Sequence, residues 1–434
     1  MLSGELATQV DAVWGAFSQE VEADPQRAIS RITRLVGGDG EIRGAAPPAR
    51  QTATSGQAAA TPELSRTVHA QLHEYLLSKV EPTGESGAAY STISATPHSV
   101  TTLMVALVAP TPRDTIIDPA VGTGGLLVAA GEFLREHHPE VWLDPRLREH
   151  FSTAAFTGVD STASACGVAL MNLQFHGSAN PTILHADSLA EGQAGVGRYS
   201  LVLAHPPSSG MRTAQPAARA LLKMVRTKRV ELLYLAQVLR LLEVGGRAAV
   251  IVPDSLLAGT SKAHLDLRRM LLTEFRLDAV VRLPPAVLRA EADRSSSILL
   301  VQKSGMTADV WFYDVRSQAV RPPTGGPEGD PADPGSLRAA DLVDLLSRWK
   351  SLETAPSSER ARPRGAQSFV VGITEITDQD FDLSFDRYRI AVAEFVAHRS
   401  PTDILVDITR LELRIQQGAA ALARSLADGS VGTP

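Results

Sequence analysis

The sequence is poor in cysteine, in long apolar runs and in net positive charge. Cys166 is the only cysteine in 434 residues, so the chain can form neither an internal disulfide nor a cysteine-based metal site. The longest apolar stretches, such as residues 126–130 and 248–252, are much shorter than the roughly 20 residues that span a bilayer. The first residues lack the basic and apolar regions of a secretion signal. These absences predict a cytoplasmic protein with no membrane segment and no metal site.

The charge balance argues against a stand-alone nucleic-acid binder. Acidic residues outnumber basic ones by 48 to 42, which gives a net charge of -6 and a pI near 6.0. The surface as a whole will not attract a polyanion, so DNA binding would need a local basic face or a partner subunit. The length predicts a large α/β core with one or two smaller appendages.

The central part of the chain alternates short β-rich runs with helices, which predicts a mostly parallel sheet covered on both faces. Seven strands are expected, at residues 115–118, 156–160, 182–186, 200–204, 247–252, 277–283 and 296–302. The last two are joined by a link too short for a crossover helix, so they should pair antiparallel. The expected fold is therefore α/β, with a mixed seven-stranded sheet that ends in a hairpin.

Four regions are expected along the chain. Residues 1–95 form a helical region with a linker at 37–60, and residues 96–316 form the core. Residues 317–400 hold a linker, a helix near 337–352, a second linker at 355–367 and a post-core segment. Residues 401–434 hold a helix near 402–426 and a tail. That helix has apolar residues near heptad spacing and could dock a partner or pack within the chain.

The most informative local feature is the turn Asp118-Pro119-Ala120-Val121-Gly122-Thr123-Gly124-Gly125 after the first expected strand. Its three glycines let the backbone approach a ligand, and the helix that follows presents free N–H groups. The glycines alone are also compatible with a tight strand-to-helix connection. Asp160 and Asp187 end the next two strands, where carboxylates can bind a nucleoside, although either one could simply cap its strand. The joint pattern favours a nucleoside cofactor.

Further segments follow this turn in a distinctive order. They include Thr96-Pro97-His98-Ser99-Val100, Asn172-Leu173 with His176-Gly177, Gly246 to Asp254, and Asp382-Leu383-Ser384 with Arg387-Tyr388. Together they resemble the modification subunits of type I restriction-modification systems, which are N6-adenine DNA methyltransferases. The resemblance runs from about residue 96 to residue 388.

The resemblance implies a Rossmann-like class I methyltransferase that binds S-adenosyl-L-methionine. The Thr96-Pro97 segment would close over the methionine end of the cofactor. A separate specificity subunit, docked through the C-terminal helix, would recognise the DNA sequence. The implied cofactor residues are Thr96, Pro97, Asp118, Pro119, Ala120, Gly122, Thr123, Gly124, Gly125, Asp160 and Asp187.

The chain departs from the family at the expected catalytic motif. Where the family has Asn-Pro-Pro followed by an aromatic residue, this chain reads His205-Pro206-Pro207-Ser208. In the family the Asn oxygen and the first Pro carbonyl hold the adenine amine, and the aromatic ring stacks on the flipped base. Neutral His205 offers a ring nitrogen as acceptor, but Ser208 offers no ring, and base stacking is worth roughly 1–3 kcal/mol. The motif is either degenerate, or repurposed with His205 as a general base.

A basic run follows this motif, with no acidic residue before Val230. It would meet DNA phosphates if DNA were bound, or it could form a solvated helix face. Its members are Arg212, Arg219, Lys223, Arg226, Lys228 and Arg229. The sequence thus predicts an adenine-N6 DNA methyltransferase that acts with a specificity subunit. The alternatives are a catalytically degenerate scaffold or regulator, and a methyltransferase for a small molecule or a protein.

Overall fold

The computed structural model describes the core of the chain. It covers residues 96–390 except 193–194, 209, 212–216, 285–286, 289–294, 316–336, 338, 355 and 366, together with Thr409, Arg410, Glu412, Gln416 and Gln417. The chain divides into two compact units, Met1–Arg389 and Ile390–Pro434. The predicted N-terminal helical region lies outside the described residues. So does most of the predicted C-terminal helix, of which the five residues named above are helical.

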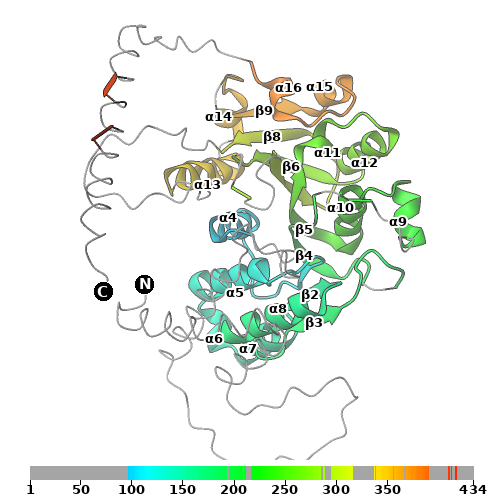
Figure 1. Cartoon of the computed structure of the whole chain (residues 1–434), viewed down its shortest axis with the longest axis vertical. Coiled ribbons are helices and arrows are strands. Elements are labelled where there is room, and N and C mark those ends of the chain that lie inside the picture. The colour runs from blue at the N-terminus through cyan, green and yellow to red at the C-terminus, as the bar shows by residue number, and fades with distance from the viewer. Residues whose placement is uncertain are drawn as a thin grey trace, which may run out of the picture. The chain divides into compact units, whose positions relative to one another are not determined.

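Nine strands form one twisted sheet in the first unit (Figure 1). Their order across the sheet is β3-β2-β1-β4-β5-β7-β6-β8-β9. Strands β2 and β3 lie on one side of β1, and β4 and the later strands lie on the other, so the order of the strands switches between β1 and β4. The pairs from β3 to β5 are parallel, and ligands of such sheets bind at the carboxyl ends next to this reversal. The strands are β1 (Ile116–Asp118), β2 (Phe156–Asp160), β3 (Thr182–His185), β4 (Tyr199–Ala204), β5 (Leu242–Pro253), β6 (Arg276–Arg282), β7 (Ser296–Gln302), β8 (Asp309–Asp314) and β9 (Ser368–Gly372).

The seven predicted strands are all present, and the predicted antiparallel pairing of the last two is confirmed by the register of β6 with β7. The prediction that this hairpin ends the sheet was wrong. The strand β7 inserts between β5 and β6, and β8 pairs parallel with β6 while β9 pairs antiparallel with β8. The sheet therefore has two strands more than the seven predicted, of which β8 lies within the predicted core of residues 96–316 and β9 lies beyond it.

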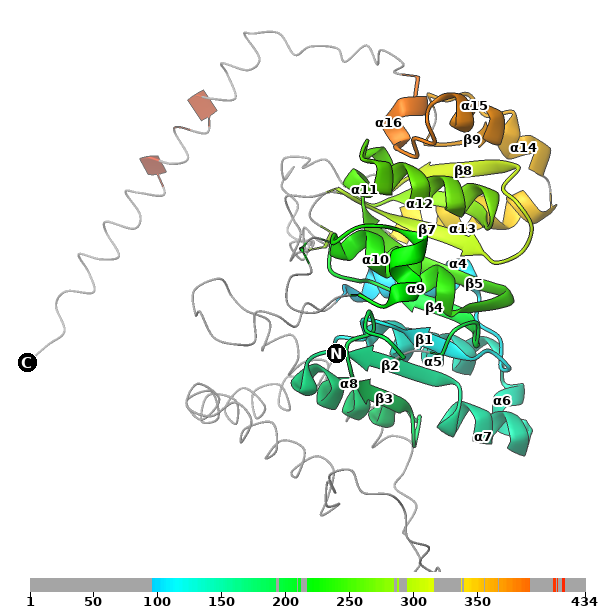
Figure 2. The same ribbon diagram turned by 90° about the vertical axis from the view of Figure 1, so that its right-hand side faces the viewer.

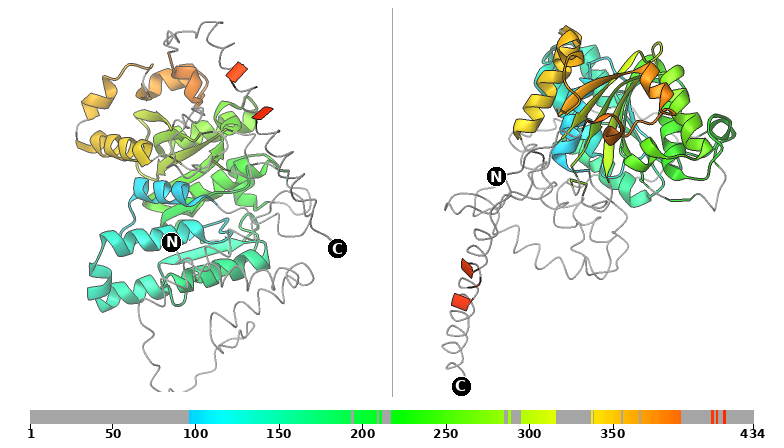
Figure 3. Two further views of the ribbon diagram at one scale, coloured as in Figure 1. Left: turned by 60° about the vertical axis from the view of Figure 1, so that its left-hand side comes forward. Right: turned by 90° about the horizontal axis from the view of Figure 1, so that it is seen from above.

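Helices cover both faces of the sheet, as the view from above shows (Figure 3). Side chains of α4 (His98–Val108), α5 (Gly125–His137), α7 (Pro145–Thr153), α8 (Ala163–Phe175) and α13 (Ala339–Thr354) contribute to one buried cluster. The opposite cluster includes α9 (Arg219–Met224), α10 (Val230–Leu241), α11 (Asp254–Ala258) and α12 (Lys262–Thr273), with α10 and α12 at the front in Figure 2. The short helices are α6 (Glu140–Leu143), α14 (Pro356–Arg360), α15 (Ile373–Asp378) and α16 (Phe385–Tyr388). Apart from the exposed edge strand β3, the sheet is thus buried between two apolar layers.

The segment after β8 packs onto the sheet. Residues 355–367, predicted as a linker, contain α14, and the predicted helix near 337–352 is α13. Phe312 of β8 stacks on Phe369 of β9 at 5.5 Å between ring centroids, and Phe385 lies 5.0 Å from Phe369. Tyr388 completes this cluster at 5.4 Å from Phe312. Four aromatic rings therefore fasten β9 and α16 to the core.

Candidate cofactor and target-base site

The glycine turn leads from β1 into α5 at the carboxyl edge of the sheet. Gly124 is the N-cap of α5 and has a φ of 83°, in the left-handed region that favours glycine. A Cβ atom at Gly124 would lie 3.2 Å from the Cα atom of Ala169 on α8. A larger residue is thus disfavoured both by the backbone angle and by the close approach of α8. The approach of this turn to a ligand stays a prediction.

A buried amide on α8 holds this turn in place. The Asn172 side-chain nitrogen donates to the carbonyl oxygen of Thr123 at 3.1 Å, and Asn172 is only 5% exposed. Its other side-chain atom, Oδ1, is buried without a hydrogen-bond partner in the described structure. In the sequence, Asn172 belongs to one of the segments that resemble the family, but the sequence did not indicate a role for it. A contact across 49 residues has no local sequence signal.

Three carboxyl groups follow successive strands, as predicted. The Asp118 carboxylate is buried and accepts from the Ala120 backbone N–H at 2.9 Å. The Asp160 carboxylate accepts from the N–H groups of Gly122 at 3.1 Å and Thr162 at 2.8 Å, so it joins the glycine turn to the end of β2. Asp187 accepts from its own loop, at Leu189 N, at 3.0 Å. The structure thus brings Asp118, Asp160 and Gly122 together.

Burial raises the pKa of Asp118 to about 7, and the neighbouring charge of Asp160 adds to this rise, while the Ala120 N–H opposes it. Asp118 therefore changes its protonation near neutral pH. A carboxyl group that is neutral at this position can donate as well as accept a hydrogen bond.

The described residues fit a nucleoside cofactor. A carboxylate has about four lone-pair positions, and Asp160 uses two of them for backbone N–H groups. The remaining positions can accept the two ribose hydroxyl protons. Gly124 keeps the backbone of the turn open, and the N-terminus of α5 directs N–H groups toward a ligand. The roles of Pro119, Ala120, Thr123 and Gly125 within this turn stay predictions.

Strand β4 leads into His205-Pro206-Pro207-Ser208 at the same edge. Neighbouring β1 ends at Asp118 and β4 ends at Ala204, directly before His205. The Nδ1 atom of His205 is hydrogen-bonded to Oγ1 of Thr96 at 2.8 Å. Pro206 is buried, and Ser208 is half-buried. The predicted cofactor segment and the predicted target motif are therefore in direct contact, which the sequence did not show.

Tyr234 on α10 is a further residue of this edge that sequence reasoning missed. Burial raises the pKa of its hydroxyl, and the charges of Asp187, Asp160 and Asp118 add to this effect. Tyr234 therefore lies within the field of all three carboxyl groups. Its position in an apolar helix is typical of a core residue, so the sequence carried no signal for it.

The basic run leads away from the motif along an exposed surface. Arg219 and Lys223 lie on α9, and Arg226, Lys228 and Arg229 lie between α9 and α10, all of them exposed. Arg229 forms an ion pair with Glu231 at 3.3 Å. A bridge between Met211 and Arg229 ties the run to the loop after Ser208. Arg212 lies outside the described residues.

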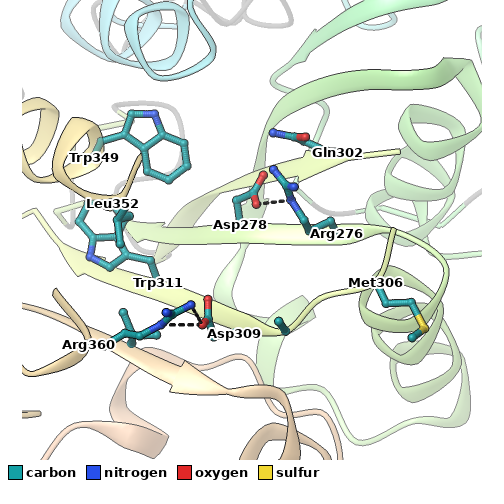
Figure 4. Close-up of a pocket in the computed structure, with 11 residues that line it drawn as sticks. Arg276, Asp278, Gln302, Met306, Asp309, Trp311, Trp349, Leu352 and Arg360 are labelled. Carbon is teal, nitrogen blue, oxygen red and sulfur yellow. Dashed lines mark hydrogen bonds and ion pairs between the residues drawn. The ribbon is translucent and has the colours of Figure 1, made fainter. Parts of the chain in front are cut away.

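A separate pocket lies at the opposite edge, where β6 and β8 begin (Figure 4). Its volume is about 400 Å³, and its walls include the indoles of Trp311 and Trp349. Its charged side chains pair with each other, Arg276 with Asp278 at 2.7 Å and Arg360 with Asp309 at 2.5 Å. A register shift next to Asp278 interrupts the pairing of β6 with β7 here. This pocket is no part of the cofactor edge.

Two other kinds of feature are absent from the described residues. No described helix has both the length and the apolar character needed to cross a bilayer. Across the same residues, His, Cys, Asp and Glu side chains nowhere gather in threes as ligands for a metal ion.

Comparison with known proteins gives the family. A model of the N-6 DNA methylase family matches residues 65–394. The EcoKI and StySJI type I restriction enzyme methylase subunits, from Escherichia coli K12 and Salmonella typhimurium, are each 27% identical over 267 residues. These alignments cover 58% of this chain and 49% of each relative, so the chain spans about half the length of these curated relatives.

A solved structure shows the same fold. It is a modification subunit of a putative type I restriction enzyme from Vibrio vulnificus YJ016, with a TM-score of 0.57 and 24% identity. The match covers 73% of this chain and 62% of the other. The sheet order, the glycine turn and this likeness agree on a class I methyltransferase fold with two added strands. With the family model matched over most of its length, the chain belongs to the N-6 DNA methylase family.

Proposed function

We propose that this chain transfers a methyl group from S-adenosyl-L-methionine to the N6 amine of adenine in DNA. The observation that carries the proposal is the shared edge at which the glycine turn, Asp160 and the His205-Pro206-Pro207-Ser208 motif meet. Family membership supports the reaction class, because the matched family is that of N-6 DNA methylases.

In this proposal residues at the ends of β1 and β2 would hold the cofactor. Asp160 would accept its ribose hydroxyl protons, Gly122 and Gly124 would admit it close to the backbone, and Asp187 would lie near its adenine. Thr96 and Pro97 lie at the methionine end. When bound, the cofactor supplies an electrophilic methyl group carried on a sulfonium. Asp118, whose pKa is about 7, supports the turn through the Ala120 N–H.

The motif after β4 orients the target amine. The Pro206 carbonyl and a ring nitrogen of neutral His205 accept its two N–H hydrogens, which aims the nitrogen lone pair at the methyl group. Ser208 offers no aromatic face, so the flipped base gains no stacking at that position. The reaction would therefore be slower than in relatives that carry an aromatic residue there.

DNA and a second subunit complete the proposed assembly. The exposed residues Lys223, Arg226 and Lys228 lie beyond the motif, where backbone phosphates would pass. The relatives are named as methylase subunits of restriction enzymes. We infer that this chain likewise works with a specificity subunit, which docks on the C-terminal helix and provides sequence recognition within a restriction-modification system.

The replacement of the family motif favours one rival, a catalytically degenerate subunit that binds cofactor without transfer. The protein, with and without the product of a neighbouring gene, is incubated with labelled S-adenosylmethionine and DNA. We expect the chain alone to bind the cofactor. We expect N6-methyladenine to form only when the partner is present. Cofactor binding without transfer supports the degenerate subunit, and His205→Asn with Ser208→Phe should then restore transfer. Absence of cofactor binding overturns the proposal.

A further inference from the structure

The pocket where β6 and β8 begin has a wall of aromatic rings (Figure 4). The indoles of Trp311 and Trp349 are 5.8 Å apart between ring centroids and form one surface. The N–H group of Trp311 donates to the Glu359 carboxylate at 3.0 Å. That of Trp349 donates to the Leu107 carbonyl oxygen at 2.9 Å. These bonds fix both rings, so the wall offers a ligand aromatic surface and no N–H donor.

Hydrogen-bonding groups line another part of the pocket. Arg276 Nε donates to Asp278 Oδ1 at 2.7 Å, and within the described residues the other guanidinium N–H groups of Arg276 make no hydrogen bond. The Gln302 side chain makes a second hydrogen bond to Asp278, while its amide oxygen accepts from Ser304 at 3.1 Å. Burial raises the pKa of Asp278, and the contacts with Arg276 and Gln302 offset only part of this rise. A carboxylate has about four lone-pair positions, so Asp278 keeps about two of them for a ligand.

The charges of the walls favour a neutral group over a simple ion. Two arginines are matched by two aspartates, because Arg276 pairs with Asp278 at 2.7 Å and Arg360 pairs with Asp309 at 2.5 Å. The volume of about 400 Å³ is in the range of small-molecule sites. A flat group that stacks on the indoles and carries both donors and acceptors on one edge therefore fits these walls.

We propose that this pocket binds a guanine nucleotide, whose base stacks on Trp349 and pairs with Asp278 and Arg276. The Watson–Crick edge of guanine has one acceptor, O6, beside two donors, N1–H and N2–H. Asp278 supplies two acceptors and the adjacent Arg276 supplies the donor, so the two sets are complementary. Adenine has only one donor group on this edge, beside an acceptor, so a lone pair of the base would face the Asp278 carboxylate.

The rim of the pocket suits the phosphate. Arg360 of α14 is 56% exposed, and both of its hydrogen bonds to Asp309 come from Nε and Nη2. Its Nη1 group makes no hydrogen bond within the described residues, and guanidinium groups bind phosphate well. The pocket lies at the edge of the sheet opposite to the glycine turn, so this nucleotide would not compete with the methyl donor.

Calorimetry with the whole chain and GMP tests the site. Saturating S-adenosylhomocysteine is included, because a nucleotide could otherwise enter the cofactor edge. GMP should bind at one site per chain, and AMP and CMP should bind at least about tenfold more weakly. Tryptophan fluorescence should be quenched by GMP, because its base stacks on Trp349. The thermal unfolding temperature should rise most with GMP, since a ligand of the native state stabilises it.

An exchange of specificity tests the contact with Asp278. Asp278→Asn replaces one acceptor by an NH2 donor, while its remaining oxygen still accepts from Arg276. Xanthosine monophosphate, whose base has a carbonyl oxygen in place of the 2-amino group of guanine, matches this variant. Asp278→Asn should therefore bind GMP at least about tenfold more weakly than the native chain and xanthosine monophosphate at least about tenfold more tightly. Partial unfolding would weaken both ligands and could not produce this exchange.

Trp349→Leu tests the aromatic wall. It should weaken GMP binding about tenfold and reduce the quenching, because the base loses its stacking partner. Trp142→Leu, on α6 and outside the pocket, is the matched control and should bind GMP normally. If Trp349→Leu does not fold, the exchange in Asp278→Asn still decides the proposal.

Four results would overturn the proposal. The first is absence of GMP binding to the folded native chain at about 1 mM. The second is equal affinity for GMP and AMP. The third is unchanged nucleotide preference in Asp278→Asn. The fourth is much tighter GMP binding when S-adenosylhomocysteine is left out, because the nucleotide would then occupy the cofactor edge.

Discussion

Arg268 of α12 donates its Nε hydrogen to the carbonyl oxygen of Phe381 at 2.7 Å. Its Nη1 group reaches two more carbonyls, those of Leu256 at 2.9 Å and Gly259 at 2.8 Å. Arg268 is only 2% exposed, so this buried cation is stabilised by three backbone dipoles. Phe381 and Asp380 both have positive φ angles, 57° and 54°, and Arg268 fixes the tight bend that they form. Arg268 thus joins the post-core segment to α11 and α12.

Replacing this arginine should strongly destabilise the chain. Arg268→Met removes the donor of three carbonyls, of which that of Leu256 is in a buried residue and those of Gly259 and Phe381 are in half-buried residues. Because a buried acceptor without a donor costs about 1–3 kcal/mol, the free energy of unfolding should fall by at least about 1 kcal/mol. Urea denaturation measures the loss. The neighbouring Arg269→Met is the control, because Arg269 is exposed and only stacks on the Phe381 ring at 5.1 Å. Equal losses in the two variants would contradict the role given to Arg268.

Sequence reasoning located most of the fold but not its far edge. The seven core strands could be predicted because each is a short β-rich run with turn signals on both sides, and all of them except the exposed edge strand β3 are largely buried. Strand β9 was missed, since its five residues, Ser368–Gly372, directly follow a stretch that resembles a linker. Its place in the sheet depends on pairing with β8, more than 50 residues earlier in the chain. Such pairing is decided by tertiary contacts and not by local propensity.

Some features of the candidate site could likewise be predicted from the sequence, and others could not. The glycine turn and the carboxyl groups that end strands were predictable, because their chemistry is local and follows from strand position. The contacts of Asn172 with Thr123 and of Thr96 with His205 were not, because each joins segments far apart in the sequence. Tyr234 was hidden for a different reason, since an aromatic residue in an apolar helix is usually part of the core.

Loss of the Asp160 charge should weaken cofactor binding. Asp160→Asn keeps the size of the side chain but removes a charged acceptor, and hydrogen bonds to charged groups are worth about 1.5–3 kcal/mol. The Kd for S-adenosylmethionine, measured by calorimetry, should rise roughly 10-fold to 100-fold. Asp386→Asn, at an exposed side chain that pairs with Arg282, is the matched control and should bind normally. Normal binding by Asp160→Asn would remove this residue from the cofactor site.

Two glycine-to-alanine changes should have opposite effects on stability. Gly124→Ala places a Cβ atom at a φ of 83° and 3.2 Å from the Cα atom of Ala169, which should cost about 1–2 kcal/mol and weaken cofactor binding. Gly167→Ala lies within α8 with no atom near its Cβ position, so it should stabilise by up to about 1 kcal/mol. Thermal and urea unfolding compare them. The predicted constraint on the turn would be refuted by a stabilising Gly124→Ala.

Asp118 should make stability depend on pH in the direction opposite to that of most carboxyl groups. Its folded pKa is about 7 against an ordinary value of 3.8, mainly because burial disfavours the charged form. The stability that neutral Asp118 provides is therefore complete below about pH 4 and is lost as the pH rises through about 7. Asp118→Asn stays neutral and keeps an acceptor for the Ala120 N–H. Between pH 4 and 7 the native chain should lose stability relative to this variant, and parallel pH profiles would refute the shifted pKa.

The basic run should determine the salt dependence of DNA binding. Lys223→Ala combined with Arg226→Ala removes two exposed cations next to the motif. The slope of log affinity against log salt should become shallower by about 2 if each cation meets one phosphate. Arg146→Ala with Arg148→Ala, at two exposed cations on α7, is the matched control and should leave the slope unchanged. Binding of the complete complex at several salt concentrations measures both, and equal slopes for the two double variants would exclude a DNA role for this run.

The aromatic cluster of Phe312, Phe369, Phe385 and Tyr388 bears on how the chain is made. During synthesis β8 leaves the ribosome well before β9 and α16. Phe312 can therefore contact the rings of Phe369, Phe385 and Tyr388 only after those later residues have been made. Until Tyr388 has left the exit tunnel, one face of the growing sheet stays uncovered at that strand. The order of synthesis therefore makes this edge the last part of the core to close, and apolar surface at β8 stays exposed to aggregation until then.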